Sequence, residues 1–331
     1  MIKEEKLILD ILFNEINIKD YDICDINEKK LMSILTSHLI LPTFYSILKR
    51  KKFLTFFNKD LIVYMKEIYN INYSRNLLLI EECKIISNIF TEHNIDYVFL
   101  KGSANILSDL YNDIGVRMVG DVDILVKKKS ASKAFNLIKK IGYKSDENIF
   151  FSSKRHLPRL KNKEKLFSIE IHTAITDKVE NNKICSELIL RNKCCHNGFF
   201  TPNFESMILT NIYNHQINDY GYVKFSYSLR NLYDSFLIQK KVKNIFDAND
   251  RYVKRYLSIA DQMNISSFKN VLKINNCERI QFYFFNRLKF FKKINYLLVA
   301  CKLKSRNLPD QIYLYLTNKD YRKYLISKFN L

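Results

Sequence analysis

The sequence predicts an α+β fold, in which a small mixed-sheet core is flanked by N-terminal and C-terminal helical regions. Three observations indicate this fold. Apolar residues recur at helical spacing through residues 1–92, a segment without glycine. Alternation typical of strands appears between residues 93 and 175, and helical spacing returns over residues 176–331. We therefore expect an N-terminal helical region (1–92), a core (93–175) and a C-terminal helical region (176–331).

The N-terminal region is predicted to hold three helices. Apolar residues follow one helix face at positions 7–12, 31–40 and 61–90. Pro42 is expected to interrupt or bend the second helix, because proline lacks a backbone N–H. A helical subdomain packed on the core is favoured over a linker.

The core is predicted to mix strands and helices. The expected strands are 95–100, 121–127 and 166–172, with further candidates at 143–151 and 155–162. The expected helices are 103–111 and 130–141, and Gly142 ends the second. In the last strand apolar and polar residues alternate, so that three polar side chains share one face: Ser168, Glu170 and His172. Further on, helices are expected at 204–216 and 228–240, after an irregular basic stretch at 191–202.

The most informative stretch joins a Lys-Gly-Ser turn to a pair of aspartates. Asp121 and Asp123 project from one face of their strand, because strand side chains alternate. Gly102 and Ser103 form a tight turn at the start of a helix, whose free N–H groups can hold phosphate. Paired carboxylates repel each other unless a cation lies between them. Together these features indicate a magnesium–nucleotide site.

This stretch resembles the polymerase-beta-type nucleotidyltransferase superfamily, with its Gly-Ser turn followed by an Asp-x-Asp strand. Within that superfamily, the chain looks like the bacterial "uncharacterised nucleotidyltransferase" family. The matching elements are 100–102 (Leu-Lys-Gly), 110–111 (Leu-Tyr), Arg117, 120–126 (Gly-Asp-Val-Asp-Ile-Leu-Val) and 142–143 (Gly-Tyr). The resemblance spans roughly residues 80–320 and is strongest at 97–126.

The resemblance implies an enzyme that moves NMP from ATP or another NTP to an acceptor hydroxyl or phosphate and releases pyrophosphate. Asp121 and Asp123 would bridge two Mg²⁺ ions. Glu170, on a neighbouring strand, matches the third carboxylate of the superfamily's metal site. It would hold the ion that activates the acceptor hydroxyl, or accept the proton of that hydroxyl.

The resemblance also implies a nucleotide-binding role for the turn and the loop after it. Gly102 would allow the backbone to approach phosphate, and Ser103 would offer a hydroxyl and an N–H. Lys101 and Arg117 would neutralise the β- and γ-phosphates. Structural alternatives remain open: Lys101 could be a solvated turn residue, and Arg117 could pair with a neighbouring aspartate, Asp109 or Asp113.

Five polar residues are candidates whose roles the spacing does not fix. Glu170 could also be a plain sheet-surface glutamate, and His172 beside it is expected to make structural hydrogen bonds rather than to act in catalysis. In the C-terminal helices, three residues are candidates for the acceptor side: His215, Arg230 and Asp234.

The charge distribution points to an anionic acceptor. The net charge is +20; residues 1–92 are neutral overall, residues 93–175 carry +6 and residues 176–331 carry +14. A positive field disfavours a cationic acceptor such as an aminoglycoside and suits tRNA, an anionic metabolite or a peptide. A toxin or defence role acting on tRNA is therefore one variant, and a biosynthetic role is another.

A second hypothesis is a non-catalytic RNA- or partner-binding protein with the same fold. Aromatic and basic residues interleave at 282–293, which suits base stacking and phosphate contacts, although aromatics at helical spacing are more often core. Retention of three mutually repelling carboxylates argues against this hypothesis.

The remaining composition indicates a cytoplasmic protein. Seven scattered cysteines lack the spacing of a disulfide framework, and Cys194-Cys195-His196 has no second pair at zinc spacing. No signal-peptide pattern precedes the first helix, and four basic residues interrupt the most apolar stretch, 282–302. No membrane association is expected.

Overall fold

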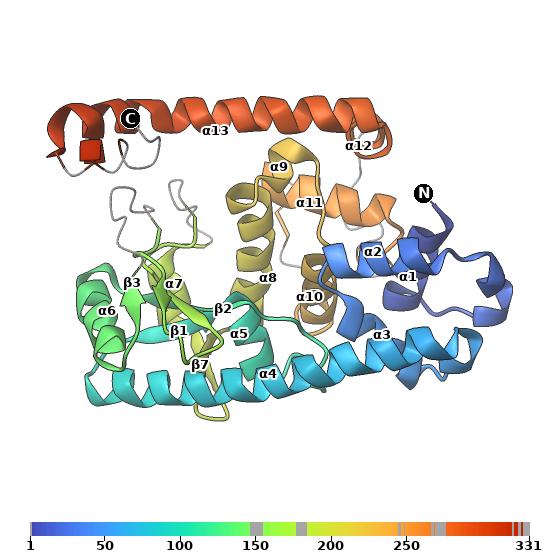
Figure 1. Ribbon diagram of the computed structural model, residues 1–331, viewed down its shortest axis with the longest axis horizontal. Helices are drawn as coiled ribbons and strands as arrows, with labels where there is room; N and C mark the ends of the chain where they lie inside the picture. The colour runs from blue at the N-terminus through green and yellow to red at the C-terminus, as the bar shows by residue number, and fades with distance from the viewer. Residues whose placement is uncertain are drawn as a thin grey trace.

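The computed structural model confirms the mixed α+β class (Figure 1). It describes residues 2–145, 155–176, 184–243, 246–247, 249–265, 268, 276–319, 321–323 and 326. A five-stranded sheet has the order β1-β2-β5-β4-β3. Its strands are β1 (Tyr97–Leu100), β2 (Asp121–Val126), β3 (Lys144–Ser145), β4 (Leu160–Lys161) and β5 (Ser168–His172). Strand β2 runs parallel to β5, whereas the other pairings are antiparallel.

The sheet register places polar residues of two strands side by side. Asp123 lies opposite Glu170 across the β2–β5 pair, and opposite Leu100 across the β1–β2 pair. Between the polar positions, Val122 and Ile169 are fully buried. The alternation read from the sequence therefore holds in both strands, and it fixes which side chains face the polar side of the sheet.

Helix α5 begins two residues earlier than the sequence suggests. It spans Lys101–Leu107 and follows β1 directly, whereas the predicted helix began at residue 103. Lys101 itself has φ of +52°, a left-handed conformation that costs a residue with a Cβ about 1 kcal/mol. This sharp turn lets the chain pass from strand to helix without a loop.

Four helices form the N-terminal region: α1 (Lys3–Phe13), α2 (Glu28–Ser37), α3 (Leu41–Arg50) and α4 (Lys59–Glu92). The predicted helix at 31–40 ends earlier than expected, because Leu39 turns the chain with φ of +51°. Pro42 does not bend this helix; it lies in the first turn of α3, where a missing N–H costs nothing.

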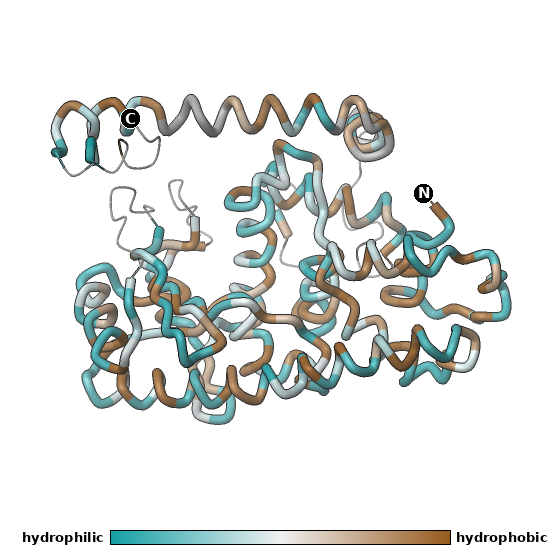
Figure 2. Tube along the Cα trace, viewed as in Figure 1, coloured by the Kyte–Doolittle hydropathy of each residue, from teal (hydrophilic) through white to brown (hydrophobic). Residues whose placement is uncertain are grey.

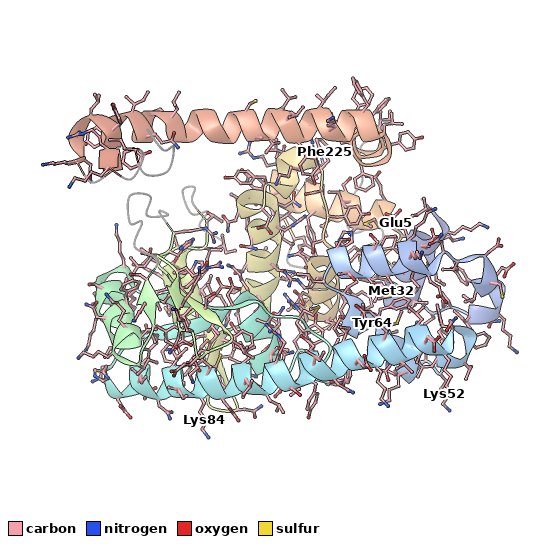
Figure 3. The ribbon with its side chains drawn as sticks, in the orientation of Figure 1. Glu5, Met32, Lys52, Tyr64, Lys84 and Phe225 are labelled. Carbon is pink, nitrogen blue, oxygen red and sulfur yellow. The ribbon has the colours of Figure 1, made fainter. Side chains whose placement is uncertain are left out.

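Helix α4 links the N-terminal region to the core. It runs beneath both in Figure 1, with hydrophobic and hydrophilic residues interspersed along it in Figure 2, and Lys84 points away from the sheet in Figure 3. On its buried side, Asn72 Nδ2 donates to the Gly115 carbonyl (2.7 Å) and Asn76 Nδ2 to the Arg117 carbonyl (2.7 Å). These bonds fix the loop before β2 to α4 and so connect the two regions. The division of the chain into separate regions at residue 92 stays a prediction.

Where the structure describes it, the C-terminal region is helical, as expected, apart from one hairpin. Its helices are α7 (Ser186–Arg191), α8 (Phe204–Tyr213), α9 (Gly221–Lys224), α10 (Leu229–Gln239), α11 (Arg251–Gln262), α12 (Asn276–Arg287) and α13 (Lys289–Thr317), with a π-helical turn at Asn214–Asn218. The stretch expected to be irregular, 191–202, instead contains the hairpin β6 (Lys193–His196) and β7 (Phe199–Pro202). Helix α13 lies along one edge of the molecule in Figure 1.

Two other expectations have partial outcomes. The candidate strand at 143–151 contains β3, and the rest of it from residue 146 on lies outside the described part of the chain. The candidate at 155–162 is reduced to the two-residue strand β4. Within the described residues, no single helix has both the length and the apolar composition needed to cross a membrane; only α2 and α3 taken together meet that test, and they bend by 117°.

Candidate active site

The sheet brings the three predicted carboxylates into one cluster. Asp121 and Asp123 project from β2, and Glu170 projects from the neighbouring β5. Asp123 and Glu170 are buried, with 2% and 5% of their surface exposed, whereas Asp121 at the strand end is partly exposed. Three carboxylates that are buried or partly buried so close together need nearby positive charge to compensate their repulsion.

Three basic side chains face these carboxylates. Lys101 Nζ lies 2.6 Å from Asp123 Oδ1, and His172 Nε2 donates to the same oxygen at 2.7 Å. The guanidinium of Arg159 contacts Glu170 Oε1 at 2.5 Å and Asp121 Oδ2 at 3.2 Å. Lys101 is therefore not a solvated turn residue, and His172 makes a buried hydrogen bond of the kind expected for it.

The pKa values of the carboxylates reflect this arrangement. Burial raises the pKa of Asp121, and the like charge of Asp123 adds to the effect. For Asp123, burial works in the same direction, but the charge of Lys101 and the hydrogen bond from His172 outweigh it and hold the pKa well below its usual range. Against the effect of burial, hydrogen bonds from His172 and Arg159 lower the pKa of Glu170 to about 2. The lowered pKa values keep Asp123 and Glu170 negatively charged, which favours the binding of a cation.

The donor set fits a divalent cation. Ligand atoms of Asp123, Glu170 and His172 all lie within 4.8 Å of one another. Carboxylate oxygens are the ligands that Mg²⁺ and Mn²⁺ prefer, and an imidazole nitrogen suits transition metals. Asp121 reaches the same cluster, since Arg159 contacts both it and Glu170.

A cavity of about 270 Å³ opens beside the carboxylates and extends to the C-terminal helices. Lys101, Gly102, Asp121 and Asp123 line its core side. Polar residues of the α8–α10 segment line the opposite side: Thr210, Asn211, Asn214, Asp219, Ser228, Arg230, Asn231 and Asp234. A ligand in this cavity would touch both the sheet and the C-terminal region.

Arg117, predicted to bind phosphate, has its charged group committed to a buried ion pair. Its Nε and Nη2 donate to Asp234 at 2.8 Å each, and its Nη1 donates to the Met118 carbonyl. The pairing with Asp109 or Asp113 that we considered is wrong, because Asp113 accepts from the Tyr69 hydroxyl at 2.7 Å and Asp109 from Asn197 at 2.7 Å. The pair joins the loop before β2 to α10.

Arg230, unlike Arg117, makes no direct ion pair with a described carboxylate. It lines the cavity and donates to the Met118 carbonyl at 3.1 Å, and within the described ranges no carboxylate pairs with it. Burial and the nearby charge of Arg117 lower its pKa to about 10. Asp234 and Asp121 attract this guanidinium from a distance, but it makes no direct ion pair with them, and a half-buried cation of this kind is suited to an anionic ligand.

The remaining predicted residues divide between the cavity wall and the core. Gly102 lies on the wall, where an added Cβ would stand 3.2 Å from both methyl groups of Val119. Ser103 is fully buried, and its hydroxyl donates to the Leu100 carbonyl at 2.8 Å. His215 is buried beside the Ser226 carbonyl (3.0 Å) and is not among the cavity-lining residues.

Sequence reasoning missed Arg159, which contacts two of the three carboxylates. Arg159 immediately precedes a two-residue strand and carries no motif. The one available signal was local: Arg159 and Glu170 lie in consecutive candidate strands, where a cation close to a carboxylate is to be expected.

Comparison with known proteins agrees with this geometry. Comparison with curated proteins gives no match. A family model described as "uncharacterised nucleotidyltransferase" matches residues 25–267, which include the sheet, the carboxylate cluster and the cavity wall on α8 and α10. The chain therefore belongs to the uncharacterised nucleotidyltransferase family.

Proposed function

We propose that this chain transfers NMP from an NTP to an acceptor hydroxyl or phosphate, with release of pyrophosphate. The observation that carries the proposal is the convergence of Asp121, Asp123 and Glu170 beside a cavity whose lining includes Lys101 and Arg230. An oxygen of the acceptor would attack the α-phosphorus, and the bond from that phosphorus to the β-phosphate oxygen would break. Catalysis of this kind depends on positioning and charge neutralisation.

The three carboxylates would hold two Mg²⁺ ions, which is what the family resemblance implies. Bound divalent cations neutralise charge on the triphosphate and make an acceptor hydroxyl easier to deprotonate. Asp121 and Asp123 would face both ions. Glu170 would hold the ion on the acceptor side or accept the acceptor's proton, and His172 would keep Asp123 oriented through its 2.7 Å hydrogen bond.

Lys101 and Arg230 are the cations that we assign to the triphosphate. Lys101 is next to Asp123 at the cavity wall, and Arg230 lies across the cavity, where no described carboxylate makes a direct ion pair with it. Gly102 leaves room on the wall for the nucleotide. Arg117 would act indirectly, by fixing the loop before β2 to α10 through Asp234.

The acceptor is proposed to be anionic, either tRNA or an anionic metabolite or peptide. The net charge of +14 over residues 176–331 supports this, because the same region provides the far wall of the cavity. Hydroxyl and amide groups on that wall, from Thr210, Asn211 and Ser228, could hydrogen-bond an acceptor or a base. A tRNA acceptor would fit a toxin or defence role, and a protein partner is included in the proposal.

The test is incubation of the protein with each labelled NTP, Mg²⁺, and either total tRNA or a small-molecule extract. We expect label in one acceptor pool with the wild type and none with Asp121→Asn or Asp123→Asn. Lys84→Ala, which removes a charge on the outer side of α4, should label as well as the wild type. RNA binding with steep salt dependence but without labelling or NTP binding would instead favour the non-catalytic hypothesis.

A further inference from the structure

Arg159 makes contacts that a metal ion would be expected to make. Its Nη2 lies 2.5 Å from Glu170 Oε1 and 3.2 Å from Asp121 Oδ2, and its Nε donates to Glu170 Oε1 at 2.8 Å. One guanidinium nitrogen thus bridges carboxylates from two strands. A hydrogen-bond donor outside the cluster would contact only one of the carboxylates. Arg159 instead lies between Asp121 and Glu170 and contacts both.

Arg159 is also placed so that it can leave. Its side chain is 46% exposed, whereas that of Glu170 is 7% exposed and fixed by β5. The residue immediately precedes the two-residue strand β4, so its side chain can rotate toward solvent without disturbing the β2–β5 pairing. The carboxylates would remain in place after the guanidinium moves.

We propose that Arg159 is a resident counter-cation, which occupies the position between Asp121 and Glu170 in the metal-free chain and must leave before a divalent cation binds there. The inference rests on the proposed function, since it assumes that these carboxylates hold metal. Two cations cannot share carboxylate oxygens at these distances, because their mutual repulsion at a few ångströms is strong even at the effective dielectric of a protein surface. Arg159 therefore lowers the affinity of the site for metal and keeps the carboxylates from repelling one another without it.

Lys101 and Arg159 differ in the carboxylates that they contact and in their position relative to the cavity. Lys101 contacts Asp123 and lines the cavity, so it can stay beside a bound triphosphate. Arg159 contacts the other two carboxylates and is not among the cavity-lining residues. Lys101 can therefore compete with metal for Asp123 alone, whereas Arg159 competes for the position between Asp121 and Glu170.

The experiment titrates the full chain with Mn²⁺, without nucleotide, and follows free Mn²⁺ by electron paramagnetic resonance. Arg159→Gln should bind Mn²⁺ on the order of tenfold more tightly than the wild type, the effect of removing one competing charge a few ångströms away. Arg159→Lys keeps the charge and should stay closer to the wild type. Lys163→Ala removes an exposed charge shortly after β4 and should change affinity less than twofold.

A second readout is thermal unfolding with and without Mn²⁺. Metal-free Arg159→Gln should melt below the wild type, because its carboxylates lack a counter-charge, and saturating Mn²⁺ should raise its melting temperature by more than that of the wild type. If Arg159→Gln binds Mn²⁺ no more tightly than the wild type, Arg159 does not compete with metal and this inference fails alone. If no protein in the series binds Mn²⁺, the proposed metal site fails as well.

Discussion

The buried ion pair between Arg117 and Asp234 allows a sharp test of how the cavity is held together. Their side chains are 8% and 1% exposed, and three hydrogen bonds of 2.8, 2.8 and 3.1 Å join them. The Tyr111 hydroxyl also donates to Asp234. Asp234→Ala would leave a buried guanidinium uncompensated, and breaking a buried pair in this way costs about 3–5 kcal/mol of unfolding free energy. That is a large part of the stability of an ordinary domain.

Urea unfolding followed by circular dichroism measures this loss. A matched control is Asp25→Ala, which removes a carboxylate from an exposed pair with Lys3 and should leave the midpoint unchanged. Replacing both partners with apolar residues, Arg117→Met with Asp234→Leu, should be less destabilising than Asp234→Ala alone, because no charge is left buried. A loss below about 1 kcal/mol for Asp234→Ala would refute the view that this pair fixes the loop to α10.

Three further predictions concern the cavity wall and the core. Arg230→Ala should lower kcat/KM for the NTP by about 10- to 100-fold in steady-state kinetics, the value of a charge-assisted hydrogen bond, and Arg230→Lys should recover part of it. Gly102→Ala should raise the KM for the NTP several-fold, because its Cβ would crowd the two Val119 methyl groups at 3.2 Å. Val119→Ala in the same chain should reverse this change. If the KM of Gly102→Ala stays at the wild-type value, the cavity wall has room for the added methyl group. Cys83 is fully buried, and burial raises the pKa of its thiol, so iodoacetamide followed by mass spectrometry should find Cys195 alkylated and Cys83 unmodified in the native protein.

The carboxylate cluster could be foreseen because its cause is local. Strand alternation decides which side chains share a face, and both β2 and β5 show it clearly in the sequence. The pairing of Asp123 with Glu170 needed one more piece of information, that the two strands are neighbours, which the family resemblance supplied. Residue type and strand period therefore account for most of the carboxylate side of the site.

The partners of the arginines could not be foreseen, because they depend on tertiary packing. Arg117 meets Asp234 across 117 residues of chain, and the candidates closest in sequence proved to bond elsewhere. Arg230 lies on α10, and the periodicity of this helix does not predict which of its polar side chains line the cavity. Helical spacing predicts amphipathicity but gives no information on the neighbouring element.

The start of α5 shows a different limit. The sequence favoured Ser103 as the first helical residue, with its hydroxyl free for phosphate. In the structure Lys101 adopts a left-handed conformation, the helix begins there, and the Ser103 hydroxyl bonds back to Leu100. A lysine at positive φ is uncommon, so propensity alone points to the wrong residue.

Nucleotidyl transfer is tested most directly by comparing α-labelled with γ-labelled NTP in the same reaction. We expect the α-label to enter the acceptor while the γ-label leaves in pyrophosphate, and we expect Asp121→Asn and Asp123→Asn to abolish the transfer. Entry of γ-label into the acceptor would show a phosphoryl transferase instead. Undiminished α-labelling by the two variants would contradict the assignment of this site.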